Sequence, residues 1–202
     1  MLLDLPYNFH WIARGEAARA AQAYVGFLPS FLRAHRIQAV INLRGQNPGH
    51  LWWKYETRVC RNLGVVHRDA KFNSRQLPSQ RMLIELVDAF DSLPRPFLVK
   101  CSGGQDRTAF AAAVFLLHRG GWPAVAQAEQ QFALWPYFHW PRTQQRWLRL
   151  FPGFARESAD GKPLRAWLQH FYHAGDFGDW LEARGHSGSF KGLYGVSSTN
   201  EP

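Results

Sequence analysis

The 202-residue sequence has only two cysteines, Cys60 and Cys101, and no run of 18 consecutive apolar residues. Two cysteines are too few for a disulfide framework or a four-cysteine zinc site, which favours a reducing compartment. Without a long apolar run the sequence predicts no membrane-spanning helix, and residues 1–15 lack the cationic start and apolar stretch of a signal peptide. We therefore expect a soluble, cytoplasmic protein.

Acidic residues are also scarce, since 15 Asp and Glu stand against 24 Lys and Arg, for a formal net charge of +9. The basic surplus is clustered, because Glu129 is the only acidic residue between Arg107 and Arg156. A field of this sign concentrates anions and raises their association rates. We therefore expect an anionic substrate or partner, and charge alone fits nucleic acid, acidic lipid and phosphorylated molecules.

The composition excludes a disordered chain, because 46% of the residues are hydrophobic and 202 residues can bury one core. Hydrophobic periodicity predicts strands at 37–44, 65–72 and 96–100, and helices at 27–35, 50–63, from 78 to before Pro94, 109–119, 123–134 and 164–173. Strands that alternate with helices predict one α/β domain with a mainly parallel central sheet flanked by helices. We expect this domain to span residues 1–185, and residues 186–202, which lack periodicity, to form a flexible tail.

The segment CSGGQDRT, residues 101–108, joins the predicted strand at 96–100 to the helix at 109–119. Its adjacent glycines allow the backbone to curl so that successive N–H groups point inward, and the helix adds the positive end of its dipole. Such a loop can cradle an anion of the size of phosphate. The expected phosphate-binding residues are Ser102, Gly103, Gly104, Gln105, Asp106 and Arg107.

Three side chains of this segment predict covalent chemistry. Cys101 starts the loop, where the N–H groups and the helix dipole favour thiolate over thiol and make the sulfur a nucleophile. Arg107 closes the loop, and its planar guanidinium can bind two phosphate oxygens at once. The hydroxyl of Thr108 can donate a hydrogen bond to the sulfur.

The segment VKCSGGQDRT resembles the signature of the cysteine-dependent protein tyrosine phosphatase superfamily: a cysteine, five residues, an arginine and Ser or Thr. The upstream stretch RGEAARAAQAYVGFLPSFLRAHRIQAVINLRG resembles the entry to small bacterial dual-specificity phosphatases, so the resemblance covers residues 8–135. It implies a dual-specificity phosphatase-like fold and hydrolysis of phosphomonoesters through a phosphocysteine at Cys101, with no metal and no cofactor. Because Ser-x-Gly-x-Asp-Arg-Thr also resembles myotubularin-type phosphoinositide phosphatases, the implied substrates are phosphotyrosine or phosphoserine proteins, phosphoinositides or similar anionic molecules.

This mechanism requires a general acid that protonates the leaving oxygen. The resemblance implies an Asp on the loop after the preceding strand, and Asp69 is the only acidic residue between Glu56 and Glu85. Asp69 is therefore our predicted acid. Alignment of strand and loop places the expected position nearer Ser74, and Asp106 within the cradle is the alternative.

Other interpretations of the motif stay open. The loop could belong to a catalytically inactive module that recognises phosphorylated protein, lipid or nucleic acid, and rhodanese-like sulfur transferases also use a strand, a cysteine loop and a helix. The resemblance implies a histidine at position 100, where this sequence has lysine. Lys100 keeps a positive charge there but loses the hydrogen bonds that the histidine would make to the loop. Arg44, at a strand end, could support the site or the fold, and Lys71 and Arg75 could receive an anionic substrate or form a solvated loop.

The segment from Trp135 to Phe154 mixes aromatic residues with Arg142, Arg146 and Arg149. Such residues occur at sites that contact acidic membrane surfaces or stack on single-stranded nucleic acid. The alternative is that the aromatic side chains belong to the core and the arginines are exposed to solvent. Nucleic acid is the less favoured partner. Cys60 is expected either to pack at a helix end or to form a protective disulfide with Cys101 under oxidation.

Overall fold

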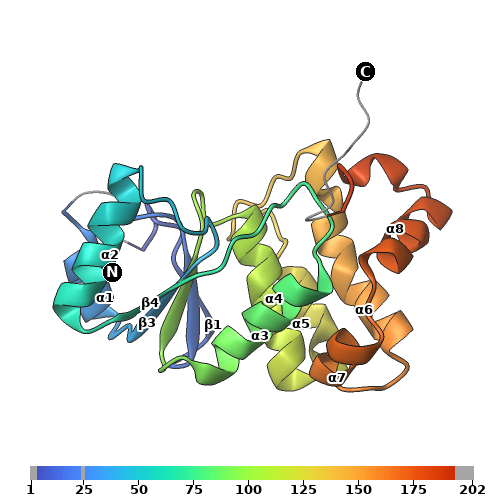
Figure 1. Ribbon diagram of the computed structural model, residues 1–202, viewed down its shortest axis with the longest axis horizontal. Helices are drawn as coiled ribbons and strands as arrows, with labels where there is room; N and C mark the ends of the chain where they lie inside the picture. The colour runs from blue at the N-terminus through green and yellow to red at the C-terminus, as the bar shows by residue number, and fades with distance from the viewer. Residues whose placement is uncertain (1–3, 24–25, 194–202) are drawn as a thin grey trace.

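The computed structural model describes residues 4–23 and 26–193, which form a five-stranded sheet between layers of helices (Figure 1). The strands are β1 (His10–Ala13), β2 (Ala17–Ala20), β3 (Ala39–Asn42), β4 (Val66–Asp69) and β5 (Phe97–Lys100). Their order is β1-β2-β5-β3-β4, with β1 antiparallel to β2 and all other neighbours parallel. This confirms the predicted α/β domain with a mainly parallel sheet.

Helices cover both faces of the sheet (Figure 1). The helix pair α1 (Leu28–Ala34) and α2 (Leu51–Leu63) packs on one face, and α3 (Gln80–Ser92) and α4 (Asp106–Gly120) pack on the other. Beyond α4 lie α5 (Val125–Gln130), α6 (Phe151–Ala159), α7 (Leu164–His170) and α8 (Ala174–Ala183), with short 3-10 turns η1 (Trp122–Ala124), η2 (Thr143–Leu150) and η3 (Ser187–Ser189). In residues 4–23 and 26–193, no helix is long and apolar enough to cross a membrane.

Alternating side chains of β3 and β5 build two separate cores. Ile41 and Val99 face α3 and α4, whereas Val40 and Leu98 face α1 and α2. Complete burial of β3 and β5 explains why both strands read as continuous apolar runs.

The sequence determines the helix ends next to this sheet. Ser79 caps α3, since its side chain accepts a hydrogen bond from the Met82 amide at 3.2 Å. At the C-terminal end of α2, Gly64 adopts a left-handed conformation with φ of 67°, which glycine tolerates at no steric cost. Both ends agree with the predicted boundaries.

Periodicity does not predict two strands, β1 and β2, or two α-helices, α6 and α8. The strand β2 reads Ala-Ala-Arg-Ala and is buried throughout, so it shows neither alternation nor the β-branched residues typical of strands. Gly153 in α6, and Gly175 and Gly178 in α8, lower the intrinsic helix propensity of these two segments. Tertiary packing stabilises both helices despite that propensity, since α6 packs against α4, α5 and α7, and α8 packs against α6 and η3.

The expected tail at 186–202 is described in part. Ser189 is buried, Phe190 packs against the core, and Leu193 forms a bridge with Leu77. Residues 194–202 lie outside the described residues, so the domain boundary at 185 stays a prediction.

Candidate active site

The carboxyl ends of the parallel strands meet at one edge of the sheet, where ligands bind in open α/β folds. A pocket of about 820 Å³ opens there. The loop after β5 forms its floor, and residues following β3 and β4 form its walls. Its lining includes Arg44, residues 71–75, Cys101, Ser102, Gly103, Gln105, Asp106, Arg107, Trp140, Arg142 and Gln145.

Cys101 lies at the base of this pocket, directly after β5, and its side chain is buried. The hydroxyl of Thr108, in the first turn of α4, donates a hydrogen bond to Sγ at 3.0 Å. A donor in this position stabilises a thiolate more than a thiol. The contact is the one that the sequence motif predicts.

The loop between Cys101 and α4 has the curled backbone expected of an anion cradle. Gly104 has φ of 65°, and a Cβ there would lie 2.5 Å from the Ala21 amide nitrogen, so only glycine fits. Within the described chain, no residue accepts a hydrogen bond from the amides of 102–105. These amides and the start of α4 are available to an anion.

A buried arginine that the motif does not include supports the loop from behind. The guanidinium of Arg19, on β2, donates to the Gly104 carbonyl at 3.0 Å and to the Gln131 carbonyl at 2.9 Å. Its cation lies 4.4 Å from the ring centroid of Tyr137, and burial lowers the pKa of Arg19 to about 10. The amide of Asn8 donates to the same Gly104 carbonyl at 3.0 Å. Arg19 therefore brings a positive charge and rigidity to the cradle.

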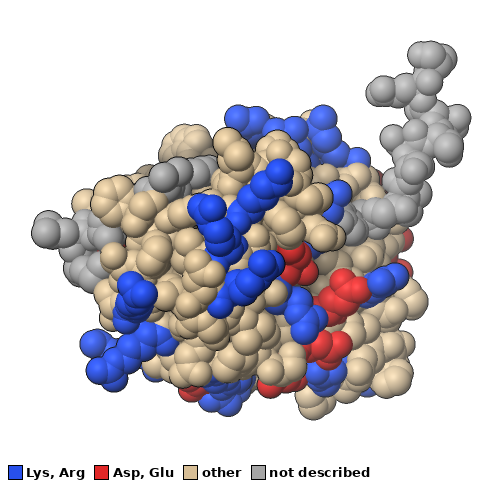
Figure 2. Space-filling model, turned by 60° about the vertical axis from the view of Figure 1, so that its left-hand side comes forward, with Lys and Arg blue, Asp and Glu red and all other residues tan. Residues whose placement is uncertain are grey.

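Arg107 lines the pocket from the first turn of α4 and donates to the Leu43 carbonyl at 3.4 Å. Four more cations line the pocket, and none pairs with a carboxylate among the described residues: Arg44, Lys71, Arg75 and Arg142. Arg44 is held instead by the Trp52 ring, 3.5 Å away, and by Gln22 at 3.3 Å. Basic side chains also outnumber acidic ones over the face of the molecule drawn in Figure 2. The pocket is strongly cationic.

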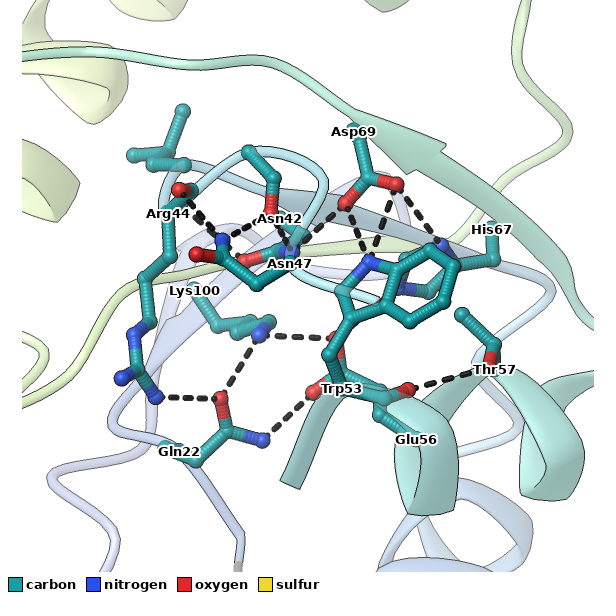
Figure 3. Close-up of polar contacts among 12 residues, drawn as sticks. Gln22, Asn42, Arg44, Asn47, Trp53, Glu56, Thr57, His67, Asp69 and Lys100 are labelled. Atoms are coloured by element: carbon teal, nitrogen blue, oxygen red, sulfur yellow. Dashed lines mark hydrogen bonds and ion pairs between the residues drawn. The ribbon is translucent and has the colours of Figure 1, made fainter. Parts of the chain in front are cut away.

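The structure does not bring Asp69, our predicted acid, to the pocket. Its carboxylate, at the end of β4, accepts hydrogen bonds from Asn42 at 2.6 Å and from the Trp53 indole at 3.1 and 3.2 Å (Figure 3). Asp69 is absent from the pocket lining, whereas Ser74 is part of it. The position expected from strand-and-loop alignment does face the pocket, but a serine occupies it.

Asp106 is the carboxylate that lines the pocket in the described chain. Its Oδ2 accepts a hydrogen bond from Gln145 at 3.0 Å, and the same amide nitrogen donates to the Ser74 hydroxyl at 2.7 Å. Its Oδ1 lies 3.3 Å from Nε2 of His139, a histidine that is buried. Two residues from the chain beyond α5 therefore hold this carboxylate.

His139 faces the other oxygen of this carboxylate. Nδ1 of His139 lies 3.2 Å from the Phe132 carbonyl, which can only accept, so Nδ1 carries hydrogen. Nε2 of His139 and Oδ1 of Asp106 lie 3.3 Å apart, and both atoms are buried without a hydrogen-bond partner among the described residues. A hydrogen bond between these two atoms would satisfy both.

Lys100 belongs to a buried polar network on the other side of the loop (Figure 3). Its Nζ lies 2.7 Å from both Gln22 Oε1 and Glu56 Oε1, and Glu56 also binds His67 at 2.8 Å. Burial lowers the pKa of Lys100 to about 8, against the opposing effect of Glu56. The Gln22 amide donates to the Ser102 carbonyl at 3.0 Å, so the network reaches the loop through the backbone. The resemblance implies a histidine here that hydrogen-bonds directly to the loop, whereas Lys100 is connected to the loop only through Gln22.

Cys60 lies in α2, in the core with α1, whereas Cys101 belongs to the core on the other face. Both are free thiols. Burial raises the pKa of Cys60 to about 12, so its thiol stays protonated at neutral pH. Of its two predicted roles, the structure shows the packing role.

In the described ranges, no three His, Cys, Asp or Glu side chains cluster as metal ligands would.

Comparison with known proteins identifies the fold. No family model matches the sequence, and no curated protein is detectably similar to it. TpbA of P. aeruginosa matches with a TM-score of 0.61 and 15% identity over 82% of this chain and 92% of that chain. The core catalytic domain of the PP-IP phosphatase SIW14 from S. cerevisiae matches at 0.52 and 12% over 89% and 93%, and PTPMT1 at 0.52 and 16% over 75% and 98%. The chain has the fold of the cysteine-based protein tyrosine and dual-specificity phosphatases, as the resemblance implies.

Proposed function

We propose that this protein is a cysteine-based phosphomonoester hydrolase that forms a phosphocysteine intermediate. The observation that supports this most is the position of the Cys101 sulfur, which accepts the Thr108 hydrogen bond at the base of a cationic pocket. A site that only bound phosphate would need the amides and Arg107, but not a nucleophile with a donor aimed at it. Hydrolysis therefore explains more of the site than recognition does.

In the first step, Sγ of Cys101 attacks phosphorus while the bond to the leaving oxygen breaks. The loop amides and the Arg107 guanidinium bind the three equatorial oxygens, whose charge is spread in the transition state. The leaving oxygen takes a proton from the carboxyl group of Asp106, which His139 faces at 3.3 Å at the pocket wall. The products of this step are an alcohol or phenol and the phosphocysteine.

In the second step, water attacks phosphorus and the sulfur–phosphorus bond breaks. Asp106, which gave up a proton in the first step, accepts one from the attacking water and regains its acid form. The Thr108 hydroxyl stabilises the thiolate that leaves. Inorganic phosphate departs and Cys101 is ready for another cycle.

The substrate class follows from the charge of the pocket. Four cations besides Arg107 line it without carboxylate partners among the described residues, so a substrate with negative charge around its phosphate gains most. Among the structures with this fold, TpbA has been solved with pTyr and PTPMT1 with PI(5)P. We therefore propose that the substrate is a phosphorylated protein segment, a phosphorylated lipid or a phosphorylated small molecule. We also propose that the protein acts in the cytoplasm.

Replacing the acid tests the assignment of Asp106. We expect Asp106→Asn to lower kcat/KM by about 10²- to 10⁴-fold for phosphate esters of poor leaving groups, because the side chain keeps its shape but cannot donate the proton. The loss should shrink as the leaving group becomes more acidic and needs less protonation. The measurement is the hydrolysis of a series of aryl phosphates, in the presence of a chelator.

Asp69→Asn is the matched control, because it makes the same change outside the pocket. We expect it to leave the dependence on the leaving group unchanged. A steeper dependence on the leaving group in Asp69→Asn, with an unchanged dependence in Asp106→Asn, would return the acid role to Asp69.

A further inference from the structure

The segment from Trp135 to Phe154 divides into a buried part and an exposed part. Trp147, Phe151 and Phe154 are buried in the main core, as the predicted core role requires. The preceding residues differ, because large apolar side chains are left in solvent: Leu134 is 55% exposed, Trp135 72%, Phe138 38% and Trp140 77%. Four exposed apolar side chains within seven residues indicate a contact surface rather than isolated surface residues.

Arginines accompany these side chains. Leu134 and Trp140 line a groove of about 420 Å³ together with Arg146 and Arg149, which project from η2. Neither arginine pairs with a carboxylate among the described residues. We call Leu134, Trp135, Phe138, Trp140, Arg146 and Arg149 the aromatic–arginine patch.

The patch is continuous with the candidate active site. Trp140 lines both the groove and the cationic pocket, and Arg142, two residues further on, lines that pocket as well. His139, between Phe138 and Trp140, is the residue that faces Asp106. A partner bound to the patch therefore lies beside the mouth of the pocket.

We propose that the aromatic–arginine patch docks on the surface of an anionic lipid bilayer. Tryptophan side chains suit the membrane–water interface, because their rings are amphipathic, and arginines there are attracted to acidic headgroups. A second copy of this chain fits less well, because two such arginine-bearing surfaces would repel each other. Docking would place the cationic pocket next to lipid headgroups. This membrane contact is a property separate from the hydrolytic function proposed above.

Vesicle binding tests the proposal independently of catalysis. Phosphatidylglycerol carries a phosphodiester and no phosphomonoester, so vesicles of phosphatidylcholine with phosphatidylglycerol probe the surface without offering a substrate. We expect the full-length protein to cosediment with these vesicles, more weakly at high salt, and not with phosphatidylcholine alone. Arg149→Glu should weaken binding by at least about fivefold, the expected effect of one basic residue near an acidic surface.

Trp135→Ala should weaken vesicle binding at both low and high salt, because its contribution is apolar. Phe171→Ala, which removes a 51% exposed aromatic ring after α7, is the matched control and should bind as the wild type does. Trp135 and Arg149 do not line the catalytic pocket, so both variants should hydrolyse a soluble aryl phosphate at the wild-type rate. A failure of the proposed hydrolytic function would appear only in that second assay.

Three results would overturn the proposal: no binding to the acidic vesicles, equal binding to neutral vesicles, or wild-type binding by both patch variants. Binding of a single-stranded oligonucleotide through the same residues, with no vesicle binding, would assign the patch to base stacking instead.

Discussion

Cys101→Ser should lower turnover of a phosphomonoester by at least about 10⁴-fold, because a serine hydroxyl at this position has no base to activate it. The sulfur accepts the Thr108 hydrogen bond, and no histidine or carboxylate is hydrogen-bonded to it in the described chain. The amides of the cradle and Arg107 are unchanged in this variant. Vanadate or phosphate binding should therefore be retained, and isothermal titration calorimetry measures it alongside steady-state hydrolysis.

The paired measurement separates loss of the nucleophile from loss of the fold. A variant that binds neither anion would have lost the cradle, and thermal unfolding would show whether the domain is intact. Turnover that persists at the wild-type rate would contradict the role of Cys101.

Arg107→Lys should lower kcat by about 10³-fold or more, comparable to the loss of an arginine that stabilises phosphoryl-transfer transition states. Lysine keeps the charge but loses the planar pair of donors that binds two equatorial oxygens. Arg44→Lys is the matched control, since Arg44 lines the same pocket but lies on the Trp52 ring. It should change KM more than kcat.

Steady-state kinetics of the two variants checks this prediction. Equal effects of Arg107→Lys and Arg44→Lys on kcat would mean that Arg107 supplies only charge to the pocket. That result would remove the specific role of the guanidinium in the transition state.

The motif and the elements around it could be predicted from the sequence, because each depends on local residues. The run Phe97 to Lys100 is buried on both faces, the glycines are adjacent, and Ala109 to Arg119 is apolar around most of its circumference. The sequence therefore predicts that residues 101–108 connect a buried strand to a buried helix. The Thr108 contact with Cys101 follows from that connection.

The groups that act on the loop from a distance could not be predicted in this way. Arg19 lies 85 residues before Gly104 in sequence, in a strand without a periodic signal, and its burial becomes visible only in the folded sheet. His139 and Gln145 follow Asp106 by more than 30 residues and reach it because α5 and η2 pack against α4. Residue type alone did not distinguish them from surface residues.

The place of Asp69 in the fold could not be predicted for a related reason. Asp69 is the predicted acid because acidic residues are rare in that part of the sequence, but proximity in sequence says nothing about which face of β4 a side chain occupies. In the folded protein Asn42 and Trp53 bind its carboxylate, and the loop that follows turns Ser74 into the pocket instead. Asp106 lies within the motif, and its contacts with Gln145 and His139 become visible only in the folded protein.

Detection of the covalent intermediate would establish the proposed mechanism. The wild-type protein is mixed with excess aryl phosphate in the presence of a chelator, quenched rapidly with denaturant, digested and analysed by mass spectrometry. We predict a phosphoryl group on the peptide that contains Cys101, absent after omission of substrate and absent in Cys101→Ser. Release of phosphate with Cys101 unmodified would contradict the mechanism, and vanadate binding without any turnover would identify the protein as a phosphate-recognition module.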